Sequence, residues 1–246
     1  MRRGVLREGS AERLTEILDR LKSEGCSVLV AGELPEPVQQ LVSQRVLGAQ
    51  HLDRVRVLTL LGPTSDVDSW FPGQVSATAA QSYVIDRWDL DRSVAVSSVG
   101  GAFGPSQADS DSLTPGDESD SLTSGDESDS TGAEDGPGVA RAVADDLDSI
   151  LGEWDVPPTR LRLATTPANG ERPGDEAIRA FVESMNATEG MAYLFLPGMG
   201  VFELDPDVTD RVDAVIEVRT RRPGAPEHRW IIPEEEVMTG WMPVES

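Results

Sequence analysis

The chain has 246 residues, of which 38% are hydrophobic, so it can bury one sizeable core or two small ones. It has 44 acidic and 21 basic residues, a formal net charge of −23, and Lys22 is its one lysine. This balance disfavours nucleic acid as a partner, because phosphate backbones attract basic surfaces. A single cysteine, Cys26, excludes an internal disulfide and a cysteine metal cluster.

The acidity has two competing explanations. One is a carboxylate-rich surface adapted to concentrated salt, where the Debye length falls to roughly 3 Å near 1 M and self-repulsion is screened. The other is a protein whose acid is confined to a linker. Acidic residues also occur outside the linker and arginine replaces lysine, so we favour a halophilic protein. No apolar run is long enough for a membrane span or a signal peptide, so we expect a cytoplasmic protein.

The N-terminal part predicts helices alternating with strands. Its first helix is capped by Ser10, carries leucine and isoleucine at helical spacing, and ends at Gly25. The apolar strand 26–31 follows, in which Cys26 is expected to be a buried, inert thiol. A second helix has Pro37 in its first turn and ends at Gly48. The remaining predicted elements are strands at 55–61, 82–85 and 93–98 and one short helix within 63–80.

A serine- and aspartate-rich segment interrupts this pattern. Residues 110–131 read SDSLTPGDE, SDSLTSGDE and SDST, a near-repeat with almost no apolar residues. We therefore expect residues 103–137 to be a disordered acidic insert that acts as a solvated spacer. Serine phosphorylation is an alternative use of this segment. Its spacing matches neither an EF-hand loop nor the glycine-aspartate calcium repeat.

Alternation resumes after the insert. A helix is expected from Gly138, with apolar residues along one stripe, followed by a strand at 160–165 and a helix containing Ile178 and Phe181. Strands at 191–196 and 213–219 follow, and the turn Pro223-Gly224 leads into strand 228–232 as a hairpin. We predict a three-layer α/β fold, with a mostly parallel sheet flanked by helices and a C-terminal antiparallel hairpin. After an N-terminal tail, 1–9, it forms one domain from residues 10–102 and 138–246.

The stretch SVLVAGELPEPV has the strand–turn–helix pattern of a phosphate-binding loop but lacks its chemistry. Such a loop needs further glycines and a lysine for the outer phosphates. Here Gly32 is followed by Glu33 and Glu36, which would repel phosphate, and by Pro35 and Pro37, which lack an N–H donor.

Other catalytic and metal-binding motifs are also absent. The sequence has no GxGxxG after a strand, no GxSxG and no HExxH. Its two histidines, His51 and His228, are interpreted as structural or surface residues. We therefore predict no catalytic, cofactor-binding or metal-binding residue and no cofactor.

Five segments carry a family resemblance: EGCSVLVAGELPEPV, VRVLTLLG, LRLATTP, GMAYLFLP and RVDAVIEVR…HRWIIPEEEVMTGWMPV. On these segments the chain resembles an uncharacterised family from salt-loving archaea, which is similar to the RecA/KaiC ATPases. The resemblance implies a RecA/KaiC-like fold. Active relatives would have a P-loop at 32–37, catalytic carboxylates near 60–62 and a magnesium-linked aspartate near 163–166. This chain has none of these groups, which implies that its Walker motifs are lost.

One basic cluster is predicted on the C-terminal hairpin. Arg219, Arg221, Arg222 and Arg229, with His228 among them, are the candidate anion or partner contact. The alternative, which we favour, is that these arginines neutralise nearby carboxylates and protect a sheet edge. The tail at Trp241 is expected to dock onto its own core.

The predicted function is that of a non-catalytic regulatory or protein-interaction module with an unknown protein partner. The alternative is an atypical nucleotide-binding protein or ATPase that acts as an oligomer and uses the arginine hairpin. A third interpretation, a DNA-associated RecA relative, is disfavoured by the net charge. Both a monomer and a homo-oligomer stay open.

Overall fold

The computed structural model describes residues 7–8, 11–49, 51–73, 75–86, 136–154, 157–167, 173–188, 190–221 and 225–244. Its strands are β1 (Arg7–Glu8), β2 (Cys26–Gly32), β3 (Val55–Leu60), β4 (Ser82–Asp86), β5 (Leu161–Thr166), β6 (Met191–Pro197), β7 (Ala214–Thr220), β8 (Pro226–Ile232), β9 (Val237–Met238) and β10 (Met242–Pro243). The helices are α1 (Ala11–Glu24), α2 (Glu36–Leu47), α3 (Gly136–Trp154), α4 (Asp175–Ala187) and α5 (Pro206–Thr209), with 3₁₀ turns at Asp68–Trp70, Pro158–Arg160 and Val201–Glu203.

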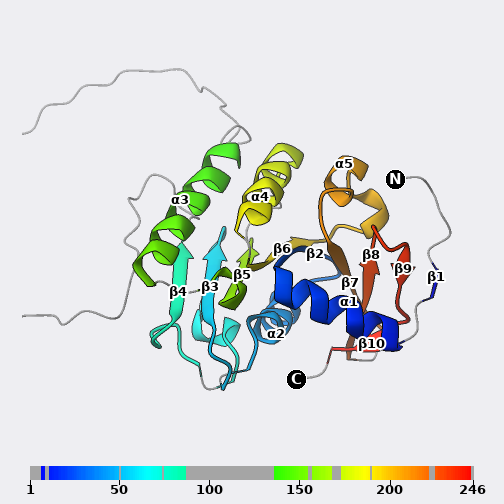
Figure 1. Ribbon diagram of the computed structural model, residues 1–246, viewed down its shortest axis with the longest axis horizontal. Coiled ribbons are helices and arrows are strands. Elements are labelled where there is room, and N and C mark those ends of the chain that lie inside the picture. The colour runs from blue at the N-terminus through cyan, green and yellow to red at the C-terminus, as the bar shows by residue number, and fades with distance from the viewer. Residues whose placement is uncertain are drawn as a thin grey trace, which may run out of the picture.

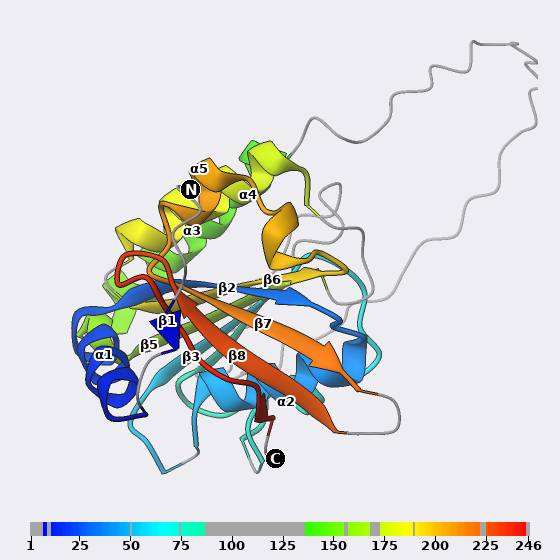
Figure 2. The same ribbon diagram turned by 90° about the vertical axis from the view of Figure 1, so that its right-hand side faces the viewer.

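All of these strands belong to one sheet. Its order is β1-β9-β8-β7-β2-β6-β5-β3-β4, and β10 pairs with β8. The strands from β7 to β4 in this order run parallel, whereas β8 is antiparallel to β7. Helices α1 and α2 cover one face, and α3, α4 and α5 cover the other (Figures 1 and 2). The predicted three-layer, mostly parallel α/β fold with a C-terminal hairpin is therefore confirmed.

The central strand β2 shows why the sheet is covered on both faces. Every residue from Cys26 to Ala31 is buried, as expected for a continuous apolar run in a parallel sheet. Side chains alternate between faces, so Leu29 and Ala31 pack in the core under α3 and α4. Val28 and Val30 pack in the core under α1 and α2.

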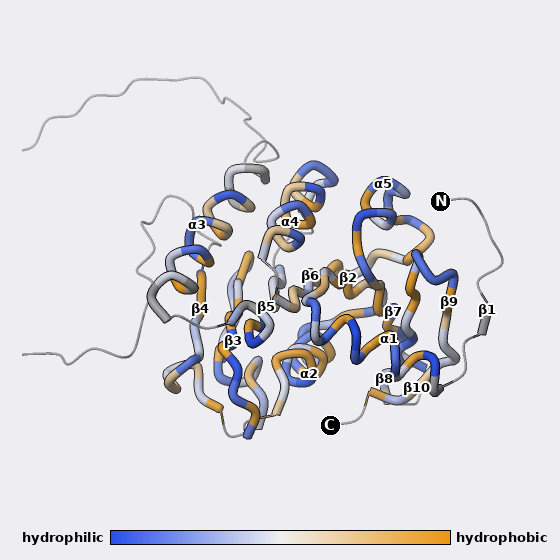
Figure 3. The backbone as a smooth tube through the Cα atoms, in the orientation of Figure 1, coloured by the Kyte–Doolittle hydropathy of each residue, from blue (hydrophilic) through white to orange (hydrophobic). Residues whose placement is uncertain are grey.

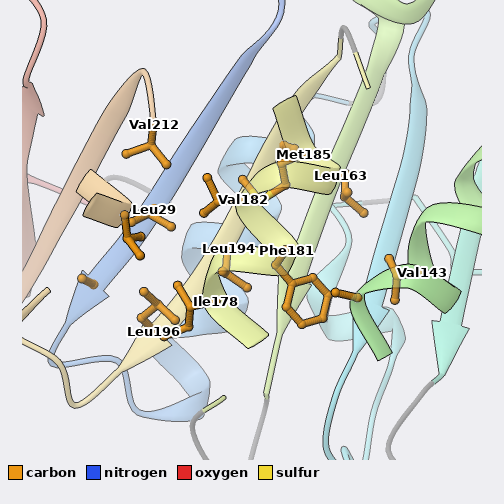
Figure 4. Close-up of a cluster of buried hydrophobic side chains, with 14 of the residues drawn as sticks. Leu29, Val143, Leu163, Ile178, Phe181, Val182, Met185, Leu194, Leu196 and Val212 are labelled. Atoms are coloured by element: carbon orange, nitrogen blue, oxygen red, sulfur yellow. The ribbon is translucent and has the colours of Figure 1, made fainter. Parts of the chain in front are cut away.

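Helix α4 supplies much of the core on its face. Ile178, Phe181, Val182 and Met185 follow helical spacing and lie over the strands around Leu194 (Figure 4). Along both α3 and α4, hydrophilic residues alternate with hydrophobic ones from turn to turn (Figure 3). Truncating Phe181 to alanine would cost about 3–5 kcal/mol, because the cavity left behind collapses only in part.

Most predicted elements occur where the pattern placed them. Helix α1 ends at Glu24, and Gly25 follows with a φ of 85°. Cys26 is 5% exposed, and burial raises the pKa of its thiol to about 12, so it is the inert cysteine expected. The short helix expected within 63–80 is the 3₁₀ turn Asp68–Trp70. Helix α3 begins at Gly136, slightly before the expected Gly138.

Some predictions fall outside the described residues. These are the Ser10 cap, strand 93–98, nearly all of the insert 103–137, Arg222 and the turn at Pro223-Gly224. The C-terminal tail is described as far as residue 244. It docks on its own sheet, since β10 pairs with β8 and Val244 is buried. Within the described part of the chain, no helix is both long and apolar enough to cross a membrane.

Candidate functional site

The sheet has a topological switch point beside β2. After β2 the chain passes through α2 to β3, beyond β6 and β5, whereas after β6 it passes to β7 on the other side of β2. The two loops therefore leave the carboxyl ends of neighbouring strands in opposite directions. Open α/β sheets bind their ligands in the crevice that such divergent loops create. The turn after Gly32 lies at this point.

Backbone hydrogen bonds hold the switch point closed. Gly198 N donates to Gly32 O at 2.8 Å, and Glu33 N donates to Val218 O at 2.9 Å. Gly32 has a φ of +120°, and a Cβ on it would lie 2.0 Å from Val218 O. The glycine is therefore needed for close packing of β2 against β7. This contact accounts for it without a phosphate cradle.

The turn after Gly32 also has a carboxylate at the place where a phosphate-binding loop would need N–H donors. Glu33 Oε2 accepts a hydrogen bond from Thr220 N at 2.8 Å. The N–H groups of Val38 and Gln39 donate to Pro35 O at 2.8 and 3.0 Å. Since proline has no N–H, Pro35 contributes no donor of its own. An anion approaching the start of α2 thus meets negative charge, and the N–H groups of Val38 and Gln39 are already bonded.

Gln39 and Thr166 occupy the position next to this turn. Thr166 ends β5, where the resemblance places a magnesium-linked aspartate, and its Oγ1 donates to Gln39 Oε1. Gln39 is only 2% exposed, and its Nε2 donates to Leu34 O at 2.9 Å. A neutral, internally satisfied pair therefore stands at this position.

The end of β3 is apolar and tied to its surroundings. Leu60 is buried, and Leu61 N donates to Thr166 O at 2.8 Å. Beyond it, Thr64 Oγ1 donates to Glu36 Oε1 at 3.0 Å and accepts from Trp70 Nε1 at 3.1 Å. Among the described residues, no group of three or more His, Cys, Asp or Glu side chains could hold a metal ion.

The C-terminal hairpin brings three predicted arginines together with acidic partners. Arg219 donates to Glu227 Oε2 from Nε at 2.9 Å and from Nη2 at 2.7 Å. Arg229 pairs with Glu217 at 2.5 Å, and Arg221 lies 3.4 Å from Glu227. These pairs follow from the register, which sets Glu217 opposite Arg229 and Arg219 opposite Glu227.

Trp241 completes this arrangement. The guanidinium carbons of Arg219 and Arg229 lie 3.7 and 4.6 Å from the centroid of the Trp241 ring. Such cation–π contacts contribute about 0.5–1 kcal/mol each at exposed sites. The three described arginines are thus placed to neutralise carboxylates and hold the tail, while the side chain of Arg221 stays 68% exposed.

A second cluster of basic residues was not predicted from the sequence. Lys22, Arg45, Arg54, Arg162 and His228 line one cavity between α1 and α2. The signal in the sequence was Arg162, a charged residue at a buried position of the apolar strand LRLATT. Both histidines agree with their interpretation as structural or surface residues, since His228 is buried and lines this cavity and His51 is exposed.

The comparisons with known proteins concern family and fold. No curated protein matches the sequence. A similar solved structure is the flagellar accessory protein FlaH from Methanocaldococcus jannaschii, with 11% sequence identity and a TM-score of 0.44 over 98% of this chain and 96% of that one. The family described as "Family of unknown function (DUF7504)" matches residues 25–218, most of the chain. The protein therefore belongs to the DUF7504 family.

Proposed function

We propose that this protein is a non-catalytic RecA/KaiC-like module of a halophilic archaeon, which acts by binding another protein as a regulator or assembly partner. One observation carries the proposal: the Glu33 carboxylate accepts the Thr220 N–H at the switch point, where a nucleotide phosphate would have to lie. A triphosphate placed there would face like charge at close range.

The surrounding residues support the loss of catalysis. Between Gly32 and Gln39 the chain has no lysine or arginine to neutralise a phosphate. The position of the magnesium-linked aspartate holds the Thr166–Gln39 hydrogen bond, and the end of β3 is leucine. Nucleotide hydrolysis needs cations and carboxylates at these points. What remains is a folded scaffold with charged surfaces that can bind a partner.

The hairpin is the surface we assign to partner contact. Arg219 and Arg229 are held by carboxylates and Trp241, so their charges are partly neutralised. Arg221 projects into solvent beside them. Arg221 directly follows β7, and exposed arginines are typical contact residues at protein interfaces.

The alternative, an oligomeric ATPase, would use the same hairpin to reach phosphates bound by a neighbouring copy. A co-purification experiment separates the two functions. The tagged chain is isolated in concentrated salt as wild type and as Arg221→Glu, with Arg160→Glu as the matched control. Arg160 is likewise exposed and paired with a carboxylate, Asp53, but lies far along the chain from the hairpin.

We expect a protein that co-purifies in stoichiometric amount with wild type and Arg160→Glu and is lost with Arg221→Glu. Each preparation is also assayed for magnesium-dependent ATP hydrolysis. Turnover by wild type that disappears in Arg221→Glu would contradict the non-catalytic function and support the oligomeric ATPase.

A further inference from the structure

A cavity of about 250 Å³ lies between α1 and the C-terminal half of α2. Arg162 and Met191 on its wall stand at the amino ends of β5 and β6, and Arg54 directly precedes β3. This side of the cavity is therefore at the opposite end of the parallel strands from Gly32 and Thr166, whereas His228 on β8 lies level with Gly32 through the register of β2, β7 and β8. Among the described residues, neither Gly32, Glu33 nor Thr166 lines the cavity, and its occupancy does not depend on the function proposed above.

The charge of this cavity contrasts with that of the whole protein. Of the described side chains that line it, five are basic and none is acidic, although the chain has a net charge of −23. It includes the one lysine of the sequence, Lys22, which pairs with Asp19 at 3.2 Å on the exposed side. In the described part of the chain, no carboxylate lies within ion-pair distance of Arg54 or Arg162.

Arg162 is the most informative member of the set. It is 4% exposed, and its Nη1 donates to the carbonyls of Thr159 and Leu161 at 2.9 and 2.7 Å. Its Nε and Nη2 donate to no described residue. Burial, and then the positive charge of Arg54, lower the pKa of this guanidinium. A buried cation with unused donors is costly unless an anion joins it.

The neighbouring Arg56 is a useful comparison, because all of its guanidinium nitrogens bind backbone carbonyls. Its guanidinium nitrogens donate to the carbonyls of Gly48, Ala49, Leu52 and Arg54 at 2.7–3.5 Å. Arg56 thereby anchors the chain that follows α2. Arg162 sits beside it in register on β5 and lines the cavity, yet only one of its three nitrogens donates to a described residue.

Two further polar groups of the wall have unused hydrogen-bonding capacity. His228 is 8% exposed, and its Nδ1 has no hydrogen-bond partner among the described residues. The hydroxyl of Tyr193 makes only a 3.9 Å contact with the sulfur of Met191. The rest of the wall is apolar, with Leu18, Val42, Val46, Ile216, Trp230 and Val244. A ligand that fits must therefore combine an anionic head with an apolar body.

We propose that this cavity binds a small organic phosphate with an apolar substituent. A phosphate dianion matches several converging cations better than a single carboxylate, and its oxygens suit the planar donor fork of arginine. At about 30 Å³ per water, the cavity has room for roughly eight water-sized groups, enough for a phosphate and a short substituent. Arg162 and Arg54 hold the head, and the valines of α2 and Trp230 contact the body, with His228 on the wall farther along.

Titration calorimetry with phenyl phosphate, in concentrated potassium chloride, tests the site. The full chain is compared with Arg162→Gln, Arg54→Gln and the cavity-filling variant Val46→Phe. The matched control is Arg160→Gln, which removes the same charge from an exposed side chain outside the cavity. Circular dichroism establishes that each variant is folded. Arg54 is half-buried, so its substitution decides the question even if Arg162→Gln does not fold.

We expect saturable binding of phenyl phosphate by wild type and by Arg160→Gln. The two cavity arginine variants should lose affinity by about tenfold or more, the usual effect of removing a charge-assisted hydrogen bond. Val46→Phe should abolish binding without changing charge. Inorganic phosphate should bind more weakly, and phenol more weakly still. The proposal is overturned if wild type gives no heat, if all arginine variants including Arg160→Gln behave alike, or if benzoate binds more tightly than phenyl phosphate.

Discussion

The carboxylate of Glu33 and the backbone N–H of Thr220 are joined by a hydrogen bond of 2.8 Å that spans the carboxyl ends of β2 and β7. A second bond, from Glu33 N to Val218 O at 2.9 Å, fixes the same residue from its backbone. The turn after the central strand is therefore a structural junction. Its acidic group and its bonded N–H groups are the basis on which we propose that no phosphate binds there.

Substituting Thr166 by valine tests the second component of this junction. Valine keeps the volume of threonine but removes the hydroxyl that donates to Gln39 Oε1. We expect a loss of about 1–2 kcal/mol in the free energy of unfolding, because a buried acceptor loses a donor. Urea denaturation in concentrated salt measures it. Thr159→Val, at an exposed position, is the control and should change stability little; equal effects of the two substitutions would show that the buried bond contributes nothing specific.

The net charge predicts a steep dependence of stability on salt. At a formal charge of −23, self-repulsion opposes the compact state in dilute buffer and is screened near 1 M salt, where the Debye length is roughly 3 Å. We expect the thermal midpoint to rise with potassium chloride. Cys26 reports the same transition, since its buried thiol should react with a thiol reagent only as the protein unfolds. A midpoint that stays constant from dilute to molar salt would contradict a halophilic origin.

His228 predicts a dependence on pH. Burial, and then the charge of Arg45, lower the pKa of its imidazole below the ordinary value of 6.5. The unfolded chain therefore takes up a proton first, so stability is full above pH 6.5 and falls as the pH drops toward the folded-state pKa. The charged or titratable side chains that share the cavity with it are Lys22 from α1, Arg45 from α2, Arg54 before β3, Arg162 from β5 and Tyr193 from β6.

Replacing each histidine in turn isolates this effect. His228→Phe should weaken the loss of stability between pH 6.5 and 5, measured by denaturation at a series of pH values. His51→Phe is the matched control, since His51 is exposed and is the only other histidine. If the two variants keep the same pH profile as the wild type, His228 does not titrate in the manner described.

The insert predicts tolerance to deletion. Removing residues 110–131, whose repeats are almost free of apolar side chains, should leave the core intact. Halving a flexible loop changes closure entropy by only about 0.6 kcal/mol, so the free energy of unfolding should change by less than about 1 kcal/mol. Circular dichroism and denaturation of the deleted chain provide the measurement. A large loss of stability would mean that the segment packs on the domain and is not a spacer.

The sequence predicted the central elements well, because they depend on local apolar patterns. The continuous run at Cys26–Gly32 and the spacing of Ile178, Phe181 and Met185 specify a buried strand and an amphipathic helix. The two-residue strands β1, β9 and β10 were missed, because two residues carry too little apolar pattern to indicate a strand. β1 lies within the expected N-terminal tail 1–9 and pairs with β9, at the far end of the chain. The lack of a lysine and of further glycines in the turn after Gly32 is visible in the sequence itself, because it depends on residue type alone.

The basic cavity could not be read from the sequence. Its five basic residues come from five separate segments, and only the fold brings Lys22, Arg162 and His228 to the wall of one cavity. Arg162 lies between apolar residues of a buried strand. This pattern indicates a buried charge, but it does not show which residues surround that charge. For the hairpin arginines, the sequence showed that they cluster. It did not show that they pair with Glu217 and Glu227, because those pairs depend on the register of β7 and β8.

The most direct measurement of the central claim is titration calorimetry of the folded protein with ATP and magnesium in concentrated potassium chloride. A closed switch point with Glu33 bound to Thr220 predicts no magnesium-dependent binding at that turn, and Glu33→Gln, which removes only the charge, should not create it. Tight, magnesium-dependent binding of ATP, with a bound-state structure placing the phosphates against Gly32, would contradict the claim.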